Sequence, residues 1–205
     1  MLKAKDQREK DLRKQHILDS AEAVLRRKGL NGLSISSVAK EAHLAQGTLY
    51  LYFKKKEDII AQLTVRSRVR LLQIFHDSIN ASSDPLEQIR NIMYANLKFF
   101  KGERIYYELT SFYEATLQQE EPPALKQASR NITALVVSVL DRAKNQGVIR
   151  SDINASEFTY MIWGTCTGMV QLIDLKSQEI EDNLQKASDK VYDTYVDFVI
   201  QGMRV

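Results

Sequence analysis

The chain has 205 residues, one cysteine and a formal net charge of +3 at pH 7. This length suffices for one large or two small domains, and a single cysteine excludes an intrachain disulfide framework. The charge is uneven: residues 1–56 carry 13 Lys and Arg against 6 Asp and Glu, whereas residues 57–205 carry 16 against 20. This distribution disfavours a protein that coats polyanions over its whole surface, and it places the basic character at the N-terminal end.

The sequence shows no targeting or membrane segment, so we expect a cytoplasmic protein without membrane contact. The N-terminal residues MLKAKDQREKDLRK lack the apolar region of a secretory signal. The longest uncharged stretch, Phe158–Ile173, has 16 residues, whereas a membrane-spanning helix needs about 20 mostly apolar ones. We therefore interpret this stretch as a buried helix of a soluble protein, and Cys166 within it as packing in a reducing compartment.

The first expected helix runs from about residue 6 to residue 28. Gly29 is placed just past its end, where helices commonly stop at a glycine. Residues 1–14 are highly charged, and they fit a solvated helix start or, alternatively, a basic arm that reaches DNA. The apolar stripe of this helix consists of Ile17, Leu18, Ala21, Val24 and Leu25.

Two short helices separated by a break follow this first helix. Ser34 is a suitable N-cap for a helix with one small apolar face. Residues 43–45 form a break of the length that joins the two helices of a helix-turn-helix. The second helix is expected over Gln46 to Phe53, with Leu49 and Phe53 on its inner side.

The outer face of the second short helix has the composition of a DNA-reading surface. We expect Gln46 and Thr48 to face base edges, and Tyr50, Tyr52 and Lys56 to hold phosphates. The lysines at 54–56 and free backbone N–H groups beside them suit the same phosphate backbone. The alternative is an ordinary solvated surface with some aromatic packing. The expected DNA contacts are Ser34, Ser37, Gln46, Gly47, Thr48, Tyr50, Leu51, Tyr52, Lys54 and Lys56.

These first 60 residues resemble the DNA-binding signature of the TetR-type transcriptional regulators. The resemblance implies a repressor that binds a palindromic double-stranded DNA operator as a homodimer, with the last two helices of each subunit forming a four-helix interface. One departure is His43, where the family usually has glycine, and we expect a left-handed or strained backbone there. The matching residues are Gly29, Ser34, Ile35, Val38, Ala39, Ala42, Leu44, Gly47, Thr48, Leu49, Tyr50, Tyr52, Phe53, Lys56, Asp58 and Ile59.

The rest of the chain has helical periodicity and almost no strand signal, which predicts an all-α fold. We expect a three-helix helix-turn-helix DNA-binding head over residues 1–56 and a six-helix ligand-binding and dimerisation body over residues 57–205. Asp84, Pro85 and Glu87 form a strong helix start, and Asn154 caps a later helix. The helices of the body are expected at about 57–78, 85–102, 103–119, 124–145, 154–174 and 181–203.

The body carries candidate dimer and effector residues. Gly164 and Gly168 lie on one helix face, where small residues permit close approach of another helix or leave room for a ligand. The expected dimer interface comprises Gly164, Gly168, Tyr195, Phe198 and Val199, the alternative being packing within one subunit. An unidentified small effector, apolar or mixed in character, is expected to contact Phe75, Asn96, Phe112, Met161, Trp163 and Thr165, each of which also suits the core.

Nothing in the sequence suggests an enzyme, a metal site or a cofactor. The three histidines are scattered without metal-ligand spacing, and no nucleophile elbow, phosphate loop or dinucleotide fingerprint is present. The remaining alternative to an effector-responsive regulator is an architectural DNA-binding protein without ligand response. Such a protein would account for the basic head, but it would leave the large acidic, apolar body unexplained.

Overall fold

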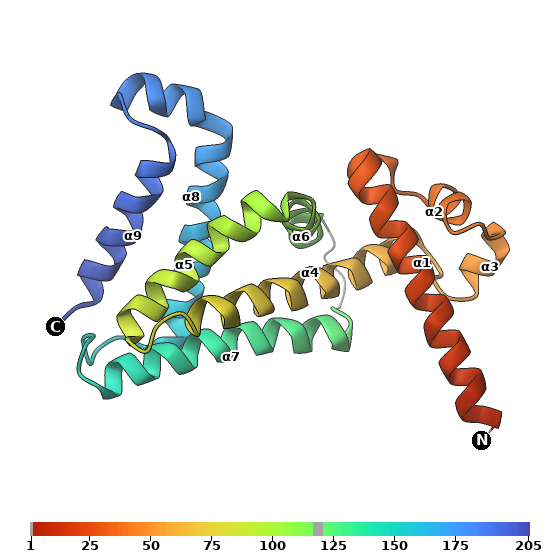
Figure 1. Ribbon diagram of the computed structural model, residues 1–205, viewed down its shortest axis with the longest axis horizontal. Helices are drawn as coiled ribbons and strands as arrows, with labels where there is room; N and C mark the ends of the chain where they lie inside the picture. The colour runs from red at the N-terminus through yellow and green to blue at the C-terminus, as the bar shows by residue number, and fades with distance from the viewer. Residues whose placement is uncertain (1, 117–120) are drawn as a thin grey trace. The chain divides into compact units, whose positions relative to one another are not determined.

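The computed structural model describes residues 2–116 and 121–205, and the predicted all-α class is confirmed (Figure 1). Within these ranges the only strand-like feature is an isolated antiparallel bridge between Ile149 and Arg204. None of the described helices combines the length and the apolar character that a membrane span requires. The helices are α1 (Leu2–Gly32), α2 (Ile35–Glu41), α3 (Gln46–Tyr50), α4 (Lys56–Ile79), α5 (Pro85–Gly102), α6 (Arg104–Thr116), α7 (Pro123–Asn145), α8 (Ala155–Leu184) and α9 (Asp189–Met203).

Two of the expected boundaries near the C-terminus are wrong. Helix α8 continues past the predicted end at residue 174, because residues 175–184 are mostly polar residues that form helices well. A kink at Lys176 (φ −123°, ψ 18°) marks where the apolar part of α8 gives way to this polar extension. Helix α8 stops at Gln185, which is left-handed (φ 52°), so α9 begins at Asp189 instead of residue 181. The predicted end of α6, residue 119, lies outside the described residues.

The packing divides the chain into two units. Unit 1 comprises Met1–Arg68 with Arg104–Lys126, and unit 2 comprises Val69–Glu103 with Gln127–Val205. Unit 1 therefore contains α1 to α3, the first part of α4, and α6. This division differs from the functional boundary at residue 56, which stays a prediction.

In unit 1, Arg66 and Tyr106 fasten α4 and α6 to α1. The Arg66 guanidinium donates to Gln15 at 2.7 Å and lies 2.7 Å from Asp19 and 3.3 Å from Glu22, all on α1. Tyr106 on α6 hydrogen-bonds to Glu22, and its ring lies 5.3 Å below the Arg26 guanidinium. Burial alone would raise the pKa of Glu22, but the hydrogen bonds from Tyr106 and Arg26 outweigh it, so the pKa is lowered.

In unit 2, α5 packs against α8 and α9. Its start is as predicted, since the Asp84 carboxylate accepts a hydrogen bond from Leu86 N at 2.9 Å and Pro85 occupies the first turn. Asn154 caps α8 in the same way, through Ser156 N and Glu157 N. The inward stripe of α8 consists of Thr159, Ile162, Cys166, Val170 and Ile173, and that of α9 of Tyr192, Val196, Ile200 and Met203.

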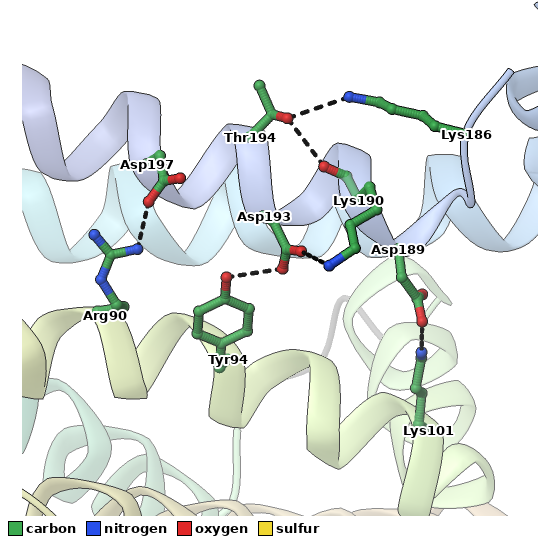
Figure 2. Close-up of polar contacts among 9 residues, drawn as sticks. All are labelled: Arg90, Tyr94, Lys101, Lys186, Asp189, Lys190, Asp193, Thr194 and Asp197. Carbon is green, nitrogen blue, oxygen red and sulfur yellow. Dashed lines mark hydrogen bonds and ion pairs between the residues drawn. The ribbon is translucent and has the colours of Figure 1, made fainter. Parts of the chain in front are cut away.

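A row of three aspartates on one side of α9 binds α5 (Figure 2). Asp197 pairs with Arg90, and Asp193 accepts from the Tyr94 hydroxyl at 2.8 Å. Lys101 pairs with Asp189. Because the aspartates and the buried stripe recur every four residues on adjoining sides of the helix, they set the rotation of α9 about its own axis. The opposite side of α9 therefore faces outward.

Candidate nucleic-acid interface

The start of α2 is held by a reciprocal serine cap. Ser34 has extended backbone angles, and its Oγ accepts a hydrogen bond from Ser37 N at 3.1 Å. Ser37 Oγ in turn accepts from Ser34 N at 2.9 Å. The predicted Ser34 cap is thus confirmed, whereas the capping role of Ser37 was not anticipated. Their contact with DNA stays a prediction.

The turn between α2 and α3 has the strained conformation expected from its histidine. His43 adopts φ 54°, a left-handed geometry that costs a non-glycine residue roughly 1 kcal/mol or more. Leu44 N bonds to Ala39 O across this turn at 2.9 Å. On the other side, His16 Nε2 on α1 donates to Ala42 O at 3.0 Å. The turn is therefore bound to α1 despite the missing glycine.

Helix α3 is shorter than predicted but has the predicted inner face. It spans five residues, and residues 51–53 continue as a turn in which Tyr52 N and Phe53 N both bond to Leu49 O at 2.9 Å. Leu49 is fully buried and Phe53 nearly so. These two apolar side chains hold the short helix against the rest of unit 1 and orient its outer face.

Two of the backbone N–H groups that were expected to meet phosphate, those of Lys54 and Lys55, bond to Asp58 instead. Asp58 Oδ2 accepts from Lys54 N at 2.8 Å and from Lys55 N at 3.2 Å, which caps the approach to α4. The Lys56 ammonium donates to Leu30 O at 3.3 Å, so this half-buried side chain reaches toward α1. The side chains of Lys54 and Lys55 are exposed, as expected. The phosphate role of Lys56 stays a prediction.

The structure gathers the remaining predicted DNA contacts on α3 and the turn after it. Tyr50 keeps 53% of its surface exposed and Leu51 keeps 83%. Gln46 and Gly47 are also exposed, while Thr48 and Tyr52 are half-buried. An exposed surface with amide, phenol and apolar groups provides the chemistry for reading base edges in a major groove.

Lys14 on α1 is a residue near this surface that we did not single out from the sequence. Its Nζ lies 5.7 Å from the centroid of the Phe53 ring, within cation–π range. The sequence could have indicated this position, because Lys14 precedes Ile17 and Leu18 by three and four residues. At that spacing Lys14 lies on the inner face of α1.

The predicted effector residues do not share one environment. Phe75 and Asn96 are buried, and Asn96 is only 8% exposed. Met161, Trp163 and Thr165 lie on the exposed side of α8, so the expectation that this helix is buried holds for only one of its faces. Phe112 belongs to unit 1, whereas the other five belong to unit 2.

The predicted dimer residues are mostly on the surface of unit 2. A Cβ added at Gly164 or Gly168 would meet open space, and Phe198 is 80% exposed on the outward side of α9. Tyr195 differs, because its hydroxyl lies 2.5 Å from Thr165 Oγ1 and its ring packs edge-on against Tyr192. Val199 is half-buried. The large apolar side chains exposed on α8 and α9 include Tyr160, Met161, Trp163, Leu172, Leu175 and Phe198.

No cluster of three His, Cys, Asp or Glu side chains suited to a metal ion occurs in the part of the chain that the structure describes. Burial raises the pKa of the Cys166 thiol, while hydrogen bonds with Tyr192 and Tyr195 oppose this increase. A thiol in this environment is a poor nucleophile at neutral pH.

Residues 17–63 match the family of bacterial regulatory proteins called the tetR family. Over 153 residues the chain is 26% identical to the fatty acid metabolism regulator protein of Bacillus subtilis. This match covers 73% of this chain and 77% of that protein. Over 118 residues it is 31% identical to an uncharacterized HTH-type transcriptional regulator of Haemophilus influenzae, covering 58% of this chain and 60% of the relative.

Solved structures share the fold. The crystal structure of the transcriptional regulator FadR from Bacillus subtilis in complex with stearoyl-CoA matches with a TM-score of 0.71 and 19% sequence identity. That match covers 93% of this chain and 99% of the other.

Proposed function

Because this protein is a TetR-type transcriptional regulator, we propose that it is a repressor that binds a palindromic DNA operator as a homodimer. The observation that carries the proposal is the α3 region, where buried Leu49 and Phe53 orient an exposed face with Gln46, Tyr50 and Leu51. Amide and hydroxyl groups discriminate base edges in the major groove, and an exposed leucine suits a thymine methyl group. We propose no catalytic activity.

A homodimer follows from the size of this recognition element. A helix of five residues contacts only a few base pairs, so specific binding needs two copies held about 34–36 Å apart on half-sites one helical turn apart. The exposed apolar side chains on α8 and α9 support a self-complementary interface there, because such patches mark interaction sites. We therefore assign dimerisation to this surface, which comprises Gly164, Gly168, Phe198 and the exposed apolar residues of α8.

Operator selection tests the reading role. Purified protein incubated with fragmented genomic DNA is expected to enrich a palindromic motif. The Gln46→Ala variant should show a weaker base preference at one or two positions of the enriched operator. The free energy of discrimination between bases should fall there by about 1–3 kcal/mol per lost bidentate contact. Lys54→Gln should weaken binding equally on all sequences and lower the salt slope by about one contact.

Lys98→Gln is the matched control for this experiment, because it removes the same charge from an exposed position on α5 in unit 2, outside the proposed surface. Enrichment of no motif would favour the architectural alternative. A change in base preference caused by Lys54→Gln, with an unaltered salt slope, would reverse the assigned roles.

For the effector we propose a long-chain acyl-coenzyme A thioester, which combines an apolar chain with a polar head. The support is the kinship with a fatty acid metabolism regulator and the fold shared with a regulator solved with stearoyl-CoA. In unit 2, Asn96 is one of two polar residues, with Gln88, on the mostly apolar buried side of α5. A polar side chain among apolar ones suits contact with a polar group of a ligand.

An acyl-CoA titration with Asn96 variants tests this assignment. Saturating stearoyl-CoA is expected to lower operator affinity at least tenfold, which corresponds to about 1.4 kcal/mol of coupling. Asn96→Leu should keep its stability and operator binding, because it places an apolar group of similar size among apolar neighbours, yet it should respond less.

Asn91→Leu serves as the control, because the Asn91 side chain bonds to Ser78 O at 3.2 Å and is not assigned to the ligand. It is expected to lose some stability and to retain the full response. If acyl-CoA thioesters of all chain lengths left operator binding unchanged, the effector class would be wrong. A normal response of Asn96→Leu would remove only Asn96 from the site.

A further inference from the structure

The N-terminal end of α3 depends on the turn that precedes it. Buried Leu49 and Phe53 anchor the helix from its middle onward. At its start the N-cap residue is Ala45, whose methyl group offers no oxygen to the first N–H groups. A helix of five residues is also far below the length of about 12–15 residues at which an isolated helix becomes stable. The places of Gln46 and Thr48 are therefore set by the turn between α2 and α3.

This turn needs support from outside the helix-turn-helix. His43 has φ 54°, and a non-glycine residue keeps such a conformation only where its surroundings enforce it. The backbone bonds of the turn are local, because Leu44 N bonds to Ala39 O at 2.9 Å and His43 N bonds to Lys40 O at 3.3 Å. They tie the turn to α2, which itself has only seven residues.

His16 on α1 provides a bond from outside. Its Nε2 lies 3.0 Å from Ala42 O, the carbonyl of the residue that caps the C-terminus of α2. Carbonyls at a helix C-terminus have no partner within the helix, and a histidine can bond to them. A carbonyl only accepts, so Nε2 carries the proton. The neighbouring Ile17 and Leu18 are 0% and 2% exposed, so the bond starts from a firmly packed part of α1, which packs against α2 (Figure 1).

We propose that His16 is a positioning residue, which fixes the turn between α2 and α3 and thereby places Gln46 and Thr48 for base reading. This inference rests on the proposed reading role of α3 and adds a residue outside the helix-turn-helix. His16 acts through Ala42 and is assigned no contact with DNA. Because a functional side chain has to be held within about 0.5 Å of its productive geometry, loss of the bond should weaken discrimination between sequences. Phosphate contacts, which carry no sequence information, should remain.

Two substitutions of His16 and one of its neighbour test the role of this bond. His16→Leu removes the N–H donor, whereas His16→Gln retains an N–H donor at a similar distance from the backbone. Both side chains fit without changing the core, because His16 is exposed and borders a surface hollow. Gln15→Leu is the matched control. It also removes a hydrogen bond of α1, but that bond comes from Arg66 on α4, at 2.7 Å, and leaves the turn untouched.

The first measurement is amide hydrogen exchange in the protein without DNA. His16→Leu is expected to speed the exchange of the Leu44 and Thr48 amides roughly 3- to 10-fold, the factor that the net contribution of one hydrogen bond represents. Rates are taken relative to the amide of Leu25, which is fully buried in unit 1, so that a general loss of stability does not count. His16→Gln and Gln15→Leu should keep the wild-type relative rates.

The second measurement is the ratio of two affinities, one for a palindromic operator selected from genomic DNA and one for a random-sequence duplex of the same length. His16→Leu should lower this ratio roughly 3- to 10-fold, because base contacts weaken while phosphate contacts persist. His16→Gln and Gln15→Leu should keep the wild-type ratio.

A sequence-specific protein whose ratio is unchanged in His16→Leu would overturn the inference and keep the repressor assignment. An equal decrease in Gln15→Leu would also overturn it, and so would a decrease in His16→Gln as large as that in His16→Leu, because the N–H donor would then be irrelevant. A protein that prefers no operator, but whose Leu44 and Thr48 amides exchange faster in His16→Leu, would lose the repressor assignment and keep His16 as the support of α3.

Discussion

Gly164→Leu is expected to convert the protein into a monomer whose affinity for a palindromic operator falls about 100-fold or more, because the gain from binding two linked half-sites is lost. The protomer itself should tolerate the change. A Cβ at Gly164 meets open space, and replacing a helical glycine with leucine favours the helix by up to about 1 kcal/mol. Sedimentation velocity and operator titration, together with thermal unfolding at low concentration, should show a more stable protomer that no longer dimerises.

Gly102→Leu is the control for this prediction. Gly102 ends α5, and a Cβ there also meets open space, so the substitution adds the same side chain outside the proposed dimer surface. It should leave the dimer intact. Phe198→Asp is an independent second variant, because burial of an unpaired carboxylate opposes association. If Gly164→Leu and Phe198→Asp both remained dimeric with normal operator affinity, the interface would have to lie elsewhere.

The second large effect concerns two leucines that lie two positions apart. Leu49→Ala should lower the free energy of unfolding by about 2–5 kcal/mol, because it creates a cavity at a fully buried position. Leu51→Ala changes a side chain that is 83% exposed, so its effect on stability should stay within about 0.5 kcal/mol. Operator affinity of Leu51→Ala should nevertheless fall several-fold, because an apolar contact with a base is lost.

Urea denaturation followed by operator titration of the folded variants measures both effects. The pair forms its own control, since the same atoms are removed once from the core and once from the surface. A Leu51→Ala variant with full operator affinity would exclude Leu51 from the reading surface. A Leu49→Ala variant with unchanged stability would contradict the packing of α3 described above.

Sequence alone determined the features that depend on neighbours a few residues apart. Ser34, Asp84 and Asn154 were identified as caps, because a cap bonds to N–H groups two or three residues ahead. The positive φ of His43 was expected from the resemblance, because the family usually has glycine at this position. Leu49 and Phe53 were placed inside from their four-residue spacing alone, and both are buried.

Only the tertiary structure decided what lies opposite each helix face. Tyr106 meets Glu22 across more than eighty residues of sequence, and Lys56 meets Leu30 O instead of solvent. Periodicity identifies an apolar stripe but does not say whether core, ligand or a second subunit covers it. The outward side of α8 is the clearest example, because its apolar residues suggested a buried helix and the fold leaves Met161, Leu172 and Leu175 exposed.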